Sequence, residues 1–124
     1  MILQFINEQM ASLGIRYEFG EWTSAIKYPY FVGEITEEPT VTESGLEEAT
    51  MLLTGFHRGG FIDLATIKNV IKKHFDPIHG LRAATEDGSA IAVFFDGSFY
   101  VPTGEADLKK IQINLKIKQW KGAL

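Results

Sequence analysis

The 124-residue sequence contains no cysteine, only three histidines and only four prolines. Without cysteine there can be no disulfide, no thiolate metal site and no cysteine nucleophile, and a reducing compartment is compatible with the chain. Basic residues are not in excess either, because the chain contains 12 Lys and Arg and 16 Asp and Glu, which gives a formal net charge of −4. We therefore expect no general attraction to nucleic acid or to anionic membranes.

Long apolar runs are also absent. The opening MILQFINEQM interrupts its apolar residues with Gln, Asn and Glu and lacks a basic start, so we expect neither a signal peptide nor a membrane span. Hydrophobic residues nevertheless make up 45% of the chain and charged residues 23%, which is typical of a packed globular protein. At this length we expect a single domain over residues 1–124.

Two segments have the spacing of amphipathic helices. The first covers residues 2–13, with Gly14 as its expected C-terminal stop. The second is expected to begin at Asp63 as N-cap and to end at Asp76 and Pro77. The apolar stripes that should be buried are Ile2, Ile6, Met10 and Leu13 in the first helix and Leu64, Ile67, Ile71 and Phe75 in the second.

Strand patterns occupy most of the remaining chain. Alternation or β-rich composition predicts strands at residues 15–19, 30–36, 48–55 and 109–119. The last is the clearest, because Ile111, Ile113, Leu115 and Ile117 alternate with polar residues. Asp87-Gly88 and Asp96-Gly97 flank the run 89–95, and Asp-Gly is favoured in short hairpins, so we expect an antiparallel meander there.

The order of these elements predicts the fold class. One helix precedes three strands, and a second helix precedes three or four more. We therefore predict an α+β protein, with a mostly antiparallel sheet and two helices packed on one face.

Charge is unevenly distributed along the chain. Residues 34–48 contain six glutamates and no basic residue, whereas residues 109–121 contain five lysines and no acid. We expect the glutamates in or near a loop, and the two ends of the sheet region to be opposite in sign. Both runs could be solvated surface, or one could meet the other on a neighbouring identical subunit, head to tail. The residues expected at such an interface are Lys110, Lys116, Lys118, Glu37, Glu38 and Glu43.

The turn His57-Arg58-Gly59-Gly60, just before the second helix, is a candidate anion site. Backbone N–H groups and the helix dipole favour an anion there, and Arg58 could bind it through two hydrogen bonds. The turn lacks the Gly-Lys-Ser/Thr ending of a P-loop, and a strand-to-helix turn needs glycines anyway, which favours a turn-forming role for Gly59 and Gly60 over anion binding.

Other chemistry-bearing groups form no motif. His74 and His79 bracket Asp76 across the expected helix end, unlike the one-face pair of a zinc protease. Ser89 and Ser98 follow Asp-Gly turns and lie on no nucleophile elbow. We therefore expect no catalytic residue, no metal and no cofactor, and a protein that is not an enzyme.

An aromatic cluster surrounds Pro29. Its members are Trp22, Tyr28, Tyr30 and Phe31. On a small sheet such residues favour the core, and an interface is the alternative because Tyr and Trp are enriched there.

Four stretches, FINEQMASLGIRYEFGEW, YPYFVGEITEEPTVTESG, LTGFHRGG and PTGEADLKKIQINLKIKQWKG, together resemble a family of small virion proteins of tailed phages and prophages of Gram-positive bacteria. The family is similar to the tail terminator or tail-to-head joining proteins of long, non-contractile tails. The resemblance implies an α+β subunit that passes from the host cytoplasm into the virion. There it would form a hexameric ring that caps the tail tube and faces the head connector, with DNA passing through the lumen without specific binding.

Two alternatives to a terminator stay open. The first is a head-closure or neck adaptor protein, which would bind the connector rather than the tube. The second, from another class, is a small anion-binding or hydrolytic domain that uses His57, Arg58 and the glycine turn.

Overall fold

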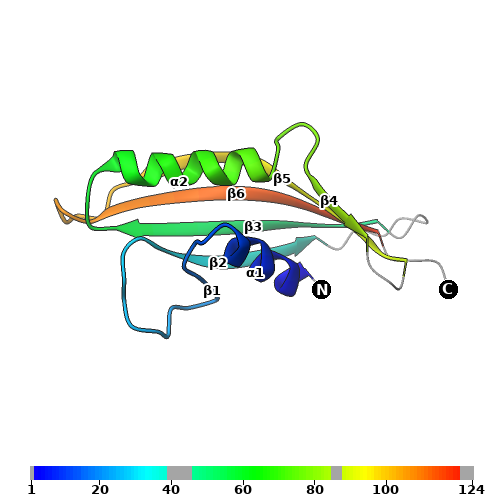
Figure 1. Ribbon diagram of the computed structural model, residues 1–124, viewed down its shortest axis with the longest axis horizontal. Coiled ribbons are helices and arrows are strands. Elements are labelled where there is room, and N and C mark those ends of the chain that lie inside the picture. The colour runs from blue at the N-terminus through cyan, green and yellow to red at the C-terminus, as the bar shows by residue number, and fades with distance from the viewer. Residues whose placement is uncertain (1, 39–45, 85–87, 121–124) are drawn as a thin grey trace.

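A six-stranded, mostly antiparallel sheet carries two helices on one face (Figure 1). The computed structural model describes residues 2–38, 46–84 and 88–120. The elements in chain order are α1 (Ile2–Ser12), β1 (Tyr17–Phe19), β2 (Tyr30–Glu38), β3 (Leu46–His57), α2 (Phe61–His74), β4 (Leu81–Ala84), β5 (Ala90–Val101) and β6 (Lys109–Trp120). The predicted α+β class and the predicted order of elements are confirmed.

The strands lie in the order β1-β2-β3-β6-β5-β4, and only the β1–β2 pair is parallel. The central pair is β3 and β6, in which Leu46 lies opposite Trp120 and His57 opposite Lys109. The beginning of β3 therefore lies beside the end of β6, although the two are far apart in the sequence.

The strand β6 has two different faces, as its alternation predicts. Ile111, Ile113, Leu115 and Ile117 are all 0% exposed beneath the helices. Burying each aliphatic side chain contributes roughly 1.5–3 kcal/mol. The intervening polar residues are half-buried on the opposite side of the sheet, which we call the open face because no helix or strand of the described residues covers it.

The helix α1 packs over β1 and β2 through its predicted stripe (Figure 1). Ile6 and Met10 are completely buried, and Ile2 packs against the same core. Gly14, with φ of +72°, reverses the chain after the last turn, where the Ile15 N–H donates to the Met10 carbonyl at 3.1 Å. The predicted glycine stop is thus confirmed.

The beginning of α2 differs from the prediction. The N-cap is Gly60 and the helix starts at Phe61, so the expected N-cap at Asp63 is wrong by three residues. Asp63 lies in the first turn, where its negative charge suits the helix dipole, and its carboxylate contacts His57 instead of capping the helix. The predicted end is confirmed: Asp76 Oδ1 accepts hydrogen bonds from the N–H groups of Ile78 (2.7 Å) and His79 (2.9 Å).

The two Asp-Gly pairs have different roles. β4 and β5 form an antiparallel pair whose connection includes Asp87-Gly88, of which only Gly88 is described, with φ of +85°. Asp96-Gly97 makes no hairpin, and the expected turn there is wrong. β5 continues through it, with a register shift against β6 between Phe95 and Ser98 and with Gly97 at φ of +104°. The positive φ that favours a hairpin turn also allows this bulge.

Several strands differ in length from the prediction, and both edge strands are short. β1 begins at Tyr17 rather than Ile15, β2 extends to Glu38, and β3 spans Leu46–His57. In the part of the chain that the structure describes, β1 pairs only with residues 31–33 of β2, and β4 only with residues 90–93 of β5. Among the described residues no helix is long and apolar enough to cross a membrane.

Candidate functional site

Three of the predicted interface residues, Lys110, Lys116 and Lys118, lie together on the open face. Alternation along β6 directs all three to this side, as predicted. Each ammonium group contacts a neighbouring strand: Lys110 lies 5.6 Å from the ring centroid of Phe56, Lys116 lies 3.7 Å from Glu48 Oε2, and Lys118 lies 5.9 Å from the ring centroid of Phe94. The lysine stems therefore cover the sheet while their charged ends stay near solvent.

The glutamates lie near the connection between β2 and β3, as expected. Glu37 and Glu38 are the last two residues of β2, and Glu47 and Glu48 follow Leu46 at the beginning of β3, so these four belong to strand ends rather than to the loop itself, and Glu43 lies outside the described residues. In the register of β3 and β6, Glu48 lies opposite Lys118.

The expectation that the acidic and basic runs occupy opposite ends of the sheet region is therefore wrong. The antiparallel pairing of β3 with β6 places the beginning of one strand beside the end of the other. The acidic and basic charges are neighbours on the open face, with glutamates on β2 and β3 and lysines on β6. The Lys116–Glu48 pair is partly solvated, so it contributes little to stability.

In the glycine turn, Arg58 is already bound by acids. Its guanidinium donates to Asp107 Oδ2 at 2.8 Å, to Glu105 Oε2 at 3.2 Å and to the Tyr28 hydroxyl at 3.2 Å. The hydrogen bond to Tyr28, followed by those to the two carboxylates, raises the pKa of Arg58. Arg58 thus holds three loops together, and an anion would have to compete with two carboxylates for it.

The remainder of the turn is shaped by His57. Its Nε2 lies 2.9 Å from Asp63 Oδ2, which ties the end of β3 to the first turn of α2. A side chain at Gly59 would overlap the His57 ring, whereas one at Gly60 would meet nothing closer than 3.9 Å. A side chain at position 59 would therefore displace the His57 ring from its place beside Asp63, which supports the turn-forming role of Gly59.

The other histidines lie apart from the turn. His74 Nε2 is 2.8 Å from Gln9 Oε1 and so joins α2 to α1, while His79 is exposed in the turn after α2. No group of three or more His, Cys, Asp or Glu side chains among the described residues could hold a metal ion.

The aromatic cluster divides between the two faces of the sheet. Phe31 is completely buried in the core. Tyr30 lies on the open face, where its ring centroid is 4.8 Å from that of Trp22 and 5.2 Å from that of Phe56. Burial is the main cause that raises the pKa of Tyr30. Core and surface positions are therefore both represented in this cluster.

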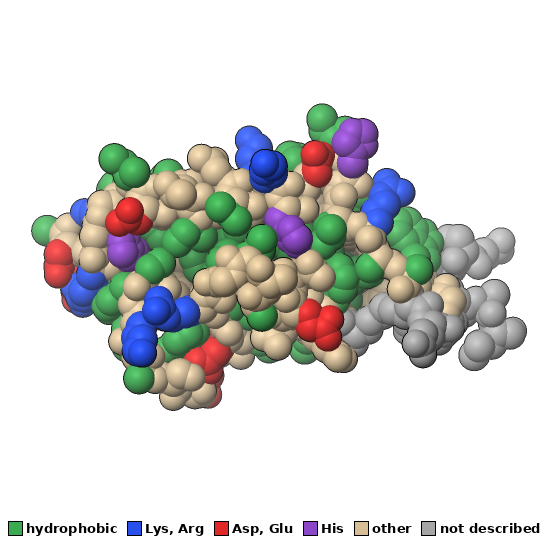
Figure 2. Space-filling view, viewed as in Figure 1, with side chains coloured by type: hydrophobic (Ala, Val, Ile, Leu, Met, Phe, Trp, Pro, Cys, Tyr) green, Lys and Arg blue, Asp and Glu red, His purple; other side chains and the backbone are tan. Residues whose placement is uncertain are grey.

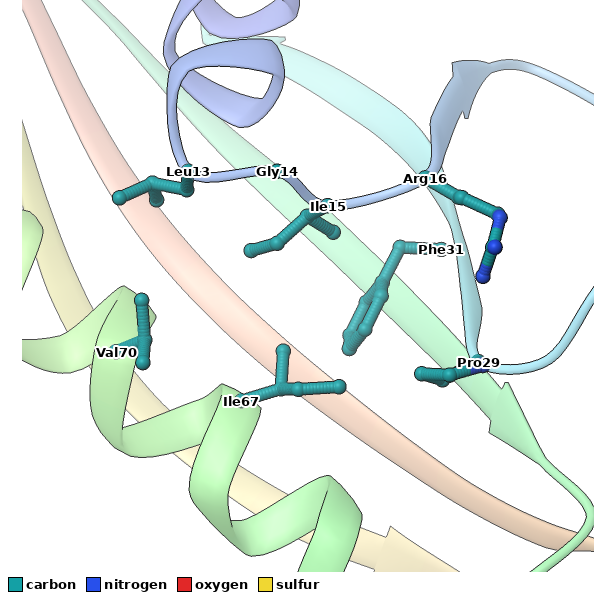
Figure 3. Close-up of a pocket in the computed structure, with 8 residues that line it drawn as sticks. All are labelled: Leu13, Gly14, Ile15, Arg16, Pro29, Phe31, Ile67 and Val70. Carbon is teal, nitrogen blue, oxygen red and sulfur yellow. The ribbon is translucent and has the colours of Figure 1, made fainter.

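Sequence reasoning missed two apolar surfaces on the helix side. The first, the interhelix pocket, is a cavity of about 180 Å³ between the end of α1 and the middle of α2 (Figure 3). Its lining residues are Leu13, Gly14, Ile15, Arg16, Pro29, Phe31, Ile67 and Val70. In the space-filling view, hydrophobic side chains show in the strip between the two helices (Figure 2).

The second surface, the apolar patch, consists of Phe61, Ile62, Ala65 and Tyr100, which line an open hollow between the beginning of α2 and β5. Phe61 and Ile62 are 48% and 80% exposed. The sequence feature that could have revealed this surface is the position of Phe61 and Ile62 directly after Gly59-Gly60. A helix that starts at Phe61 instead of after Asp63 has both apolar side chains in its first turn.

The described residues thus present surfaces for contact: a lysine-bearing open face, an interhelix pocket and an apolar patch. Comparison with protein-family models and with curated protein sequences finds no match for this chain.

Proposed function

We propose that this chain is a structural subunit of a long-tailed phage virion, a tail terminator that self-associates into a ring, caps the tail tube and joins it to the head connector. The sequence resemblance supports the placement in the tail or neck and a ring of six. Self-association is supported by the open face, a sheet surface that the described helices leave uncovered. DNA passes through the lumen of this ring without specific binding.

The charges of the open face support a directional contact. Glu34 and Glu38 on β2 lie on one side of this face, and Lys110 and Lys118 on β6 lie further across it. A surface with acids on one side and bases on the other favours one orientation of its partner and disfavours the reverse, because like charges then meet. Such selection of orientation suits a ring, in which each subunit must meet the next in the same way.

The test neutralises the open face and measures the assembly. Lys116→Gln with Lys118→Gln is preferable to reversal, because a carboxylate at position 116 would face Glu48 within the subunit. We expect weaker ring formation by native mass spectrometry and negative-stain imaging, with an unchanged thermal melting curve.

A matched control is Lys72→Gln with Lys73→Gln on α2. This variant also removes two positive charges, and Lys72, like Lys118, lies over an aromatic ring, with its ammonium group 5.8 Å from the Phe95 centroid. If the open-face variant assembles as well as the parent, its lysines are ordinary solvated surface.

Pull-down with tail-tube protein and with connector protein from the same genome then tests the position of the protein in the virion. Binding to the connector alone would make the protein a neck adaptor.

A further inference from the structure

We draw no further inference here: the strongest candidate, the interhelix pocket of about 180 Å³ between the end of α1 and the middle of α2, carries none, because nothing in the described part of the chain shows what covers its apolar lining.

Discussion

Gly55, near the end of β3, lies directly beneath a core aromatic ring. A Cβ built there would overlap Cε2 and Cζ of Phe31 and would lie 2.9 Å from Cδ2, well inside the optimal carbon–carbon separation of about 3.5–4.0 Å. Phe31 is 0% exposed, so its ring has no solvent-filled space to enter. Gly55→Ala therefore requires the ring or the strand to move.

The expected cost follows from this overlap. Overpacking a well-filled core destabilises proteins by about 1–3 kcal/mol. For a chain of this length, a loss of about 2 kcal/mol corresponds to a decrease of roughly 6–10 °C in Tm. Adding Phe31→Leu removes ring atoms from the clash, so Gly55→Ala should cost at least about 1 kcal/mol less in that background.

Thermal melting and urea denaturation of the four proteins of this double-mutant cycle measure the coupling. Gly60→Ala is the control without a steric overlap, because its Cβ would meet nothing closer than 3.9 Å, and it should lose only the preference of the α2 N-cap for Gly over Ala. A Gly55→Ala variant that melts within about 1 °C of the parent would refute the reasoning, since an error of about 1 °C is far smaller than the expected shift. Equal costs in the Phe31 and Leu backgrounds would show that another group is responsible.

Two further predictions concern single ionisable groups. Burial raises the pKa of Tyr17 to about 12, so the folded state holds this proton more tightly, and the associated stability is complete below pH 10 and is lost as pH rises toward 12. In urea denaturation, Tyr17→Phe should lose less stability than the parent as pH rises from 10 to 12. At pH 7 the substitution should not destabilise the protein, because the buried hydroxyl has no hydrogen-bond partner among the described residues. A clear loss at pH 7 would contradict this. Hydrogen bonds from the backbone N–H groups of His79 and then Ile78 lower the pKa of Asp76 below 3.8. The ionised Asp76 therefore stabilises the folded state above pH 3.8, and this stabilisation is lost as pH falls. Asp76→Asn should have a lower free energy of unfolding than the parent at pH 7, and the difference should shrink in acid. If the stability difference between Asp76→Asn and the parent is the same at pH 7 and pH 3, the charge of Asp76 is not what stabilises the turn.

Local patterns were sufficient for most of the secondary structure. In β6, strict alternation fixed both the strand and the side to which Lys110, Lys116 and Lys118 point. In α1, helical spacing and Gly14 located the helix and its end. Asp96-Gly97 was misinterpreted because a hairpin and a bulge require the same positive φ, and only the long partner strand β6 distinguishes them.

The candidate surfaces depend on partners that are distant in the sequence. Glu48 and Lys116 come together because β3 pairs with β6, and a single sequence does not reveal this pairing directly. Arg58 likewise meets Asp107 only because the loop after β5 lies beside the turn before α2. The interhelix pocket is a space left between two helices, and such a space has no signature in the order of residues.

The short edge strand β1 has a consequence for the chain at high concentration. Within residues 2–38, 46–84 and 88–120, no strand pairs with the outer side of β2 beyond Gly33, and an edge of this kind can pair with the edge of another chain and aggregate. Glu34, Glu37 and Glu38 occupy this length of β2, and their like charges repel a second such edge. Even in a concentrated solution, the chain is thereby protected from backbone-to-backbone polymerisation.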